Sequence, residues 1–507
     1  MRKLLLASAA AIGATAGMLD IASAQTLAAP QTQTLAPNPV KTLVTPSNAT
    51  AANNNNNYQA AAIPGPIATP TPGSFVIRLN GLVTNEFTFT GSSANSAIVT
   101  TPGTTSTFVG PLGKQTTVSS TTVGKNNTQA LYTYFRLYPG FDAMAANGLR
   151  YGGQAEIREN FGGNATSTTS SGTAAATSSQ TLFVRRAFLY VAADQAGLLR
   201  IGQTDGVSGI FDNGVTTFQN FASGGWNSDA SGPGPVPSNV AVTFPFFTQN
   251  AAEYGNSKFV YLSPQFAGFD IGLQYAPNAG NGAYSCPYAG NVSATSGTCP
   301  ALSSSSTLGD GNRYTNQYVA GARYQGAFGP VALYAFGSYT GSGHVNYTGS
   351  PVAAAESGPR GNTYSGQFEN LSVGFGGVAL TYAGLTVGGA YQGGQYNGAE
   401  ALAPQGGVKG RAWVAGAQYA IGPVVAGASF YNYQSQGAVA LTNISQRSEN
   451  GLDVGGTYNI APGLWGFAEY LYGTRRQGDY NFVAGTVGAA NNSVQAQTLM
   501  LGTKVRW

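Results

Sequence analysis

The stretch GFDIGLQYA, residues 268–276, alternates strictly between apolar and polar positions. On an extended strand, successive side chains point to opposite faces. The odd-numbered residues from Phe269 to Tyr275 would therefore form an apolar face, and the even-numbered residues from Asp270 to Gln274 a face of Asp, Gly and Gln. A soluble sandwich would expose Lys and Glu on its polar face. This pattern instead indicates a strand with one face toward lipid and the other toward water.

The composition supports β structure and argues against an ordinary cytosolic protein. The chain of 507 residues carries 23 Lys and Arg and 19 Asp and Glu, only 8% charged where about 25% is usual. Glycine is abundant, at 71 residues, and there is a single histidine, His344. One histidine excludes a His zinc cluster and leaves few catalytic pairs, so we predict no enzyme activity and no cofactor. The net charge of +4 has no basic block that would bind nucleic acid.

The N-terminal region predicts export. Arg2 and Lys3 precede an apolar run over 4–18 and the segment Ala22-Ser23-Ala24, which together predict a signal peptide over 1–24. Residues 25–73 are rich in Pro, Asn and Ala and predict a disordered leader. Residues 74–507 contain no run of about 20 apolar residues, so a mature chain that spans a membrane would do so as a β-barrel.

The alternating pattern recurs sixteen times. The predicted strands start near 75, 130, 149, 181, 197, 257, 269, 313, 330, 367, 384, 409, 423, 449, 464 and 495. Short and long connections alternate between them. The fold class is therefore all-β: a transmembrane antiparallel β-barrel of about 16 strands, with short periplasmic turns and long extracellular loops, while fourteen or eighteen strands stay open. Sixteen strands enclose a water-filled channel.

Arginines share the polar face of the first five predicted strands. Arg185 and Arg186 are adjacent, so alternation allows only one of them to line the channel, and we place Arg186 there. The predicted basic wall of the pore comprises Arg78, Arg136, Arg158, Arg186 and Arg200. Local salt bridges with Glu156 and Glu159 are the alternative interpretation.

The connection over about 204–256 carries acids and no Lys or Arg. A loop of this length in a compact barrel is usually functional or disordered, and its aromatic residues favour folding onto another surface. Its acids Asp205, Asp212 and Asp229 are candidates to face the arginines, with Asp205 and Asp212 on the wall opposite Arg136 and Arg158. A surface flap is the alternative.

Three passages resemble the Gram-negative general porins, the trimeric sixteen-stranded family. VRRAFLYVAADQAGLLRIGQTDG (184–206) resembles the fourth and fifth strands that lead into the inward-folded third loop. NSKFVYLSPQFAGFDIGLQYAPN (256–278) resembles the sixth and seventh strands with their Ser-Pro turn. The chain end alternates and finishes on Trp507, similar to the terminal signal read by the barrel assembly machinery, although the family usually ends on Phe.

The resemblance implies an inward-folded constriction loop over about 204–256 and a homotrimer. It implies an outer-membrane location in a Gram-negative bacterium, with outer-membrane lipid, lipopolysaccharide and the assembly machinery as partners. The expected function is a porin: a water-filled channel for passive diffusion of small hydrophilic solutes and ions. A solute-selective channel, such as a sugar channel, and a non-conducting adhesive barrel are the alternatives.

The two cysteines lie in one long predicted loop. Cys286 and Cys299 are separated by twelve residues in an exported chain, where disulfides persist, so we expect a local disulfide. A metal or redox pair would need CxxC spacing or a nearby histidine, and neither is present.

Overall fold

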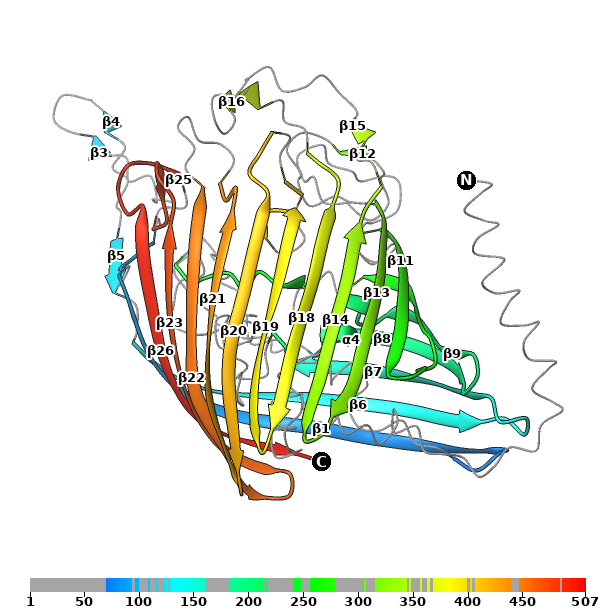
Figure 1. Ribbon diagram of the computed structural model, residues 1–507. Coiled ribbons are helices and arrows are strands. Elements are labelled where there is room, and N and C mark those ends of the chain that lie inside the picture. Colours follow the sequence, from blue (N-terminus) through cyan, green and yellow to red (C-terminus); the bar gives the residue numbers. More distant parts are fainter. Residues whose placement is uncertain are drawn as a thin grey trace.

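The chain folds as a closed barrel (Figure 1). The computed structural model describes residues 70–93, 96–99, 108–109, 115–116, 122–125, 128–159, 182–212, 215–216, 240–247, 256–278, 305–306, 315–343, 346–347, 356–357, 363–364, 368–398, 402–403, 406–438, 446–483 and 486–507. The barrel strands, in chain order, are β1 (Ser74–Ser92), β6 (Gln129–Met144), β7 (Arg150–Glu159), β8 (Leu182–Ala193), β9 (Gly197–Gln203), β10 (Ser257–Leu262), β11 (Phe269–Asn278), β13 (Thr315–Phe328), β14 (Val331–Gly341), β18 (Ser372–Tyr382), β19 (Leu385–Gln395), β20 (Gly410–Ile421), β21 (Val424–Ser435), β22 (Arg447–Ala461), β23 (Leu464–Arg476) and β26 (Ser493–Arg506).

The predicted fold class is confirmed: sixteen antiparallel strands pair with their neighbours around one ring, and β26 closes on β1. Twelve of the sixteen predicted starts lie within one residue of the observed ones, and the largest error is at β18, which begins at Ser372 rather than near 367. The only helix among the described residues is α4 (Val207–Asp212). No described helix is long and apolar enough to cross a membrane.

The period-two pattern places apolar side chains outside and polar ones inside. Phe269 and Ile271 are 56% and 49% exposed on the outer face of β11, whereas Asp270 and Gln274 are each 4% exposed on the inner face. The outward side chains match a lipid environment, and the inward polar side chains line the interior.

The two ends of the barrel differ. Two- to six-residue turns join strand pairs at the end where the C-terminus lies (Figure 1). In the turn between β18 and β19, Ala383 and Gly384 both have positive φ, 46° and 85°, which matches the twist of the strands they join. Small two-stranded sheets lie in the connections at the other end: β2 (Ser96–Val99) with β5 (Thr122–Lys125), β3 (Phe108–Val109) with β4 (Gln115–Thr116), β12 (Ser305–Ser306) with β15 (Asn346–Tyr347), β16 (Glu356–Ser357) with β17 (Thr363–Tyr364), and β24 (Tyr480–Asn481) with β25 (Thr486–Val487).

Helix α4 packs against the inner face of β11, β13 and β14. Gly272 and Gly321, which are register partners on β11 and β13, make room for it. A Cβ at Gly272 would lie 2.8 Å from the Val207 side chain, and one at Gly321 would lie 3.1 Å from the Phe211 ring. The backbone N–H of Val207 donates to the Gln274 side-chain oxygen at 2.8 Å. Because Gly272 and Gly321 have no side chains, helix α4 packs in direct contact with the barrel wall.

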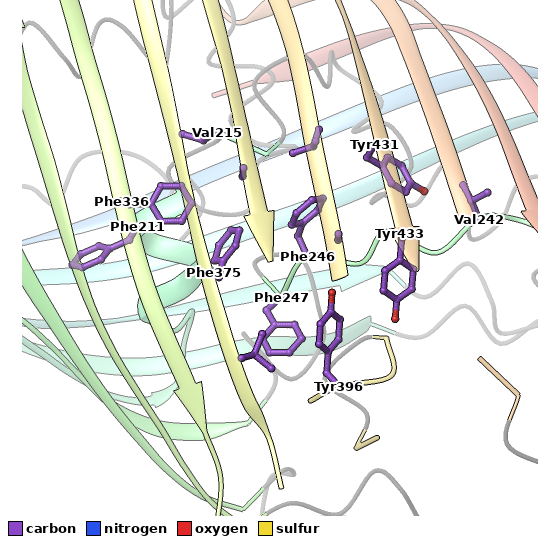
Figure 2. Packing of buried hydrophobic residues seen from close by; sticks show 14 of the residues in the cluster. Phe211, Val215, Val242, Phe246, Phe247, Phe336, Phe375, Tyr396, Tyr431 and Tyr433 are labelled. Atoms are coloured by element: carbon purple, nitrogen blue, oxygen red, sulfur yellow. The ribbon is translucent and has the colours of Figure 1, made fainter. Parts of the chain in front are cut away.

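Residues 240–247 also pack inside the barrel, farther around the ring (Figure 2). The Phe246 ring lies 6.0 Å from that of Phe375 on β18, and the Phe247 ring lies 5.2 Å from that of Tyr396. The Gln392 side chain on β19 accepts from the Phe247 N–H and donates to the Pro245 carbonyl, both at 2.9 Å. The largest hydrophobic cluster among the described residues is thus a layer of loop residues packed against the inner wall from β10 to β26.

Candidate functional site

Arginines gather on the inner face of β6 to β9. Arg136 and Arg158 are direct register partners on β6 and β7, and both are buried. The Arg136 guanidinium carbon lies 4.9 Å from the centre of the Tyr134 ring. The guanidinium carbon of Arg200 on β9 likewise lies 5.5 Å from the centre of the Phe188 ring on β8. Alternation places these arginines inside because apolar residues occupy the outward positions between them.

Glu156 on β7 holds this cluster together. Its carboxylate forms ion pairs with Arg158, with Arg185 at 3.1 Å and with Arg186 at 2.6 Å. Local salt bridges, the alternative interpretation of the basic wall, are therefore present at Glu156. The side chain of Glu159, the other acid considered, lies outside the described part of the structure.

The prediction that only one of Arg185 and Arg186 faces inward is wrong. Both are buried and both contact Glu156. The register between β7 and β8 shifts at this point, where Glu156 pairs with Arg186 but Ile157 pairs with Val184. The extra residue, Arg185, belongs to a β-bulge, which interrupts strict alternation. The basic wall therefore includes Arg185, which strict alternation had excluded from the inner face.

Asp205 does not lie across the channel from the arginines. Its carboxylate forms an ion pair with Arg186, directly after the end of β9, so it belongs to the basic wall itself. Asp212 ends helix α4 and accepts from the Thr216 N–H at 2.8 Å and from its hydroxyl at 2.7 Å. The predicted opposition of Asp205 to Arg136 and Arg158 is thus wrong, because Asp205 is separated from Arg186 by only one hairpin.

Arg78 lies apart from the other predicted wall residues. It pairs with Asp142, whose carboxylate also accepts from the Tyr190 hydroxyl. In the register of β1 and β6, Arg78 pairs with Gly140, four positions from the Leu82–Arg136 pair and closer to the short turns. Of the predicted wall residues, the structure therefore brings together Arg136, Arg158, Arg186 and Arg200. Arg78 lies nearer the end of the barrel with the short turns.

Several predicted residues fall outside the described part of the chain: Asp229, Cys286, Cys299 and His344. Trp507 is described. Its N–H and carbonyl exchange hydrogen bonds with the backbone of Gly81, both at 3.1 Å, and thereby close the barrel.

Two further features of the interior, the contacts of Glu449 and the packing of Arg475 on Phe482, could not be found from the sequence. Glu449 on β22 accepts from the Thr243 N–H at 2.6 Å and forms an ion pair with Arg475 at 3.0 Å. The Arg475 guanidinium carbon lies 5.0 Å from the centre of the Phe482 ring, in the last long connection. Glu449 therefore links the inward-folded segment 240–247 to a second connection that is 235 residues further along the chain.

Several buried acids lie on the strands next to the basic wall. Glu86 on β1, Glu469 on β23 and Asp453 on β22 all point inward and are buried. Lys504 on β26 lies between β1 and β23 and also points inward. Arg447, Arg475 and Arg506 lie on the inner face of the same strands. The inner surface thus combines a basic wall over β6 to β9 with a region of mixed charge over β22 to β1.

A family model for Gram-negative porins matches residues 77–478, which is most of the chain. The chain belongs to the Gram-negative porin family. It is thus an outer-membrane channel for passive diffusion, as the resemblance in its strands predicted. No curated protein matches the chain.

Solved porin structures resemble this fold at low sequence identity. An anion-selective porin from Comamonas acidovorans is 13% identical, with a TM-score of 0.48, over 86% of this chain and 100% of that one. The trimer form of OmpT, an outer membrane protein of Vibrio cholerae, is 13% identical, with a TM-score of 0.42, over 86% and 100%. A triple mutant of the Rhodopseudomonas blastica porin is 12% identical, with a TM-score of 0.43, over 85% and 100%.

Proposed function

We propose that this porin is narrowest between the basic wall of β6 to β9 and the inward-folded loop, and that small anions pass there in preference to cations. The observation that carries the proposal is the position of the two parts on the ring. In the strand order, β6 to β9 lie eight strands away from β18 to β21, which is half of the sixteen-strand circle. Phe246 and Phe247 pack on that opposite side, so the loop and the arginines face each other.

The charges of the basic wall support an anion preference. Five arginines, Arg136, Arg158, Arg185, Arg186 and Arg200, share the carboxylates of Glu156 and Asp205, which leaves three positive charges in excess. Arginine stays charged at any ordinary pH. A charged wall in a narrow, poorly screened passage raises the local concentration of counter-ions. The inward acids of β22 to β1 do not cancel this effect, because Arg447, Arg475, Lys504 and Arg506 lie on the inner face of the same strands.

The aromatic residues of the interior support a general channel better than a sugar-selective one. Tyr431 and Tyr433 are buried beneath the loop segment 240–247, to which Phe246 belongs, and the ring faces of these residues contact one another or the wall. An aromatic track for sugars would need exposed ring faces along the passage. We therefore propose a general channel that catalyses no reaction.

The chain is proposed to act as a homotrimer after cleavage of its signal peptide at residue 24. Its outer face carries a polar patch of Asn85, Thr133 and Thr503, three neighbouring outward positions on β1, β6 and β26. The Thr133 hydroxyl donates to the Asn85 side-chain oxygen. Polar side chains are costly in lipid, so contact with another protomer is the better environment for them.

Single-channel conductance and liposome swelling test this function. The two proteins compared are the parent and a variant in which a short Gly-Ser linker replaces residues 208–247. The parent should conduct and should admit small hydrophilic solutes at rates that fall with solute size. The variant should show a larger conductance and a weaker size dependence, because neither α4 nor segment 240–247 then covers the inner wall. A folded parent barrel that admits no solute, or a variant with unchanged conductance, would contradict the proposal.

A further inference from the structure

The outer face of the barrel strands carries almost no charge. Every Lys and Arg side chain described on the sixteen barrel strands lies on the inner face, except two: Arg411 on β20 and Arg476 on β23. Both are exposed. All the described Asp and Glu side chains of these strands are on the inner side. The outer face therefore has two positive charges and no described negative charge to balance them.

These two arginines lie in one lateral row. Arg411 pairs with Gln434 on β21, Gln434 with Ser448 on β22, and Ser448 with Arg476 on β23. The Arg411 Nε donates to the Gln434 side-chain oxygen at 2.7 Å, which orients its guanidinium along the row. At about 4.8 Å between neighbouring strands, three steps separate the two arginine positions by about 14 Å. We call these four residues the outer arginine row.

A second polar row lies directly beneath it. Asn432 donates to the Asn450 side-chain oxygen at 2.7 Å, and Asn450 donates to the Thr474 hydroxyl at 3.4 Å. The same row begins with Trp413 on β20, whose indole is 43% exposed. The outward positions below this row are mostly apolar, with Phe430 and Val454 as examples. The polarity of the outer face thus rises stepwise toward the end of the barrel that carries the long connections.

The height of the arginine row places it at the edge of the membrane. The outward positions of β20 from Trp413 to Ile421 are Trp, Ala, Ala, Tyr and Ile. Eight residue steps on a strand tilted by about 40° span about 20 Å, close to the apolar band of about 25 Å in barrels of this kind. Arg411 lies one outward position beyond that band, toward the long connections. The exposed Lys409, two residues earlier in the chain, lies beyond Arg411 in the same direction. The end with short turns is periplasmic in such barrels, so the row faces the outer leaflet.

We propose that the outer arginine row binds the phosphate groups of the phosphorylated glycolipid that forms the outer leaflet. The proposal rests on the outer-membrane location of the porin. Arg411 and Arg476 take part in no ion pair with another described residue. Guanidinium groups bind phosphate through paired, charge-assisted hydrogen bonds. The apolar band beneath the row supplies the surface for the acyl chains of the same lipid, and two arginines that are three strands apart suit a headgroup with more than one phosphate.

Binding of bisphosphorylated lipid A to the purified full-length porin in detergent tests the proposal, with native mass spectrometry as the readout. The parent is compared with the Arg411→Gln, Arg476→Gln double variant. The control is Arg150→Gln, Arg506→Gln, which removes two inward cations near the opposite end. The double variant should bind about tenfold more weakly or worse because it loses two charge-assisted contacts, and the control should bind like the parent. Dephosphorylated lipid A should bind the parent as weakly as lipid A binds the double variant.

Three results would overturn the proposal: equal affinity of the parent and the double variant, an equal loss in the control, or equal binding of the dephosphorylated lipid by the parent. Displacement of the lipid by millimolar inorganic phosphate alone would also overturn it, since the row would then be a site for a soluble anion. Conductance is recorded for each variant in the same experiment. The outward arginines do not line the channel, so the double variant should conduct like the parent. A parent that does not conduct would refute the proposed function and leave the lipid result to be judged separately.

Discussion

The last residue of the chain, Trp507, pairs with Gly81 on the first barrel strand, and its indole covers the position where Gly81 has no side chain. A Cβ at Gly81 would lie 2.4 Å from the Trp507 ring. The two backbones exchange hydrogen bonds at 3.1 Å in both directions. The aromatic end of the chain is therefore part of the seam that closes the barrel, and it remains 51% exposed on the outer face.

Deletion of Trp507 should lower the amount of folded protein in the outer membrane. The deletion removes two hydrogen bonds of the closing seam and the aromatic terminus that we propose the assembly machinery reads. Heat-modifiable migration on gels of outer-membrane fractions gives the yield. Trp507→Phe should restore most of it, because the backbone pairing and an aromatic ring are kept. A deletion variant with the parental yield would show that neither contribution matters.

Replacement of Glu156 by Gln should destabilise the barrel, because three arginines would then crowd one another without their shared carboxylate. Loss of one partner of a buried ion pair costs about 3 kcal/mol or more, and water in the channel reduces this figure. Urea unfolding followed by tryptophan fluorescence measures the change.

A second substitution at the same site tests whether repulsion among the arginines causes the loss of stability. Glu156→Gln with Arg185→Gln should recover part of the lost stability, because the site then holds one positive charge fewer. If the double variant is no more stable than Glu156→Gln, then repulsion among the arginines is not the cause.

The outward patch of Asn85, Thr133 and Thr503 is predicted to lie at a protomer interface. Asn85→Trp should therefore reduce the trimeric fraction in mild detergent, because the bulkier side chain cannot fit against a neighbouring subunit. Light scattering coupled to size-exclusion chromatography reports the mass. Ala415→Trp, a matched change at an outward position on β20, should leave the mass unchanged. A monomeric parent, or equal behaviour of the two variants, would place the interface elsewhere.

Gln392 is predicted to restrict the motion of the inward-folded segment 240–247. Gln392→Ala removes the hydrogen bonds to the Phe247 N–H and the Pro245 carbonyl, so segment 240–247 loses its anchor on β19. We expect more frequent current fluctuations in single-channel recordings at the same mean strand content by circular dichroism. Gln434→Ala, on the outer face, should give the parental noise. Parental noise in Gln392→Ala would mean that the aromatic contacts alone fix the loop.

The strands and their faces could be predicted because both depend on local sequence. Side-chain alternation is a property of a single strand, and the apolar positions Phe269 and Ile271 and the polar Asp270 show it without knowledge of any neighbour. The same rule failed at Arg185, because a β-bulge depends on how two strands pair, and the pairing of β7 with β8 is not visible in either strand alone.

Contacts between distant segments could not be predicted either. The ion pair of Asp270 with Arg323 joins residues 53 positions apart, and the contact of Thr243 with Glu449 joins residues 206 positions apart. The first requires the register of β11 with β13, and the second requires the loop to fold back across the barrel interior. The composition of the 204–256 connection predicted an acidic segment, but it did not reveal that Asp205 would turn back toward Arg186 instead of crossing the channel.

The reversal potential in a salt gradient tests the central claim most directly. Planar bilayers containing the parent porin, with KCl at different concentrations on the two sides, should give a potential of the sign that chloride selectivity produces. Arg136→Glu should move it toward the cation-selective sign, because it reduces the excess of three positive charges on the basic wall by two, whereas Arg411→Glu, the same change on the outer face, should leave it at the parental value. A cation-selective parent, or equal potentials for the parent and Arg136→Glu, would contradict the account.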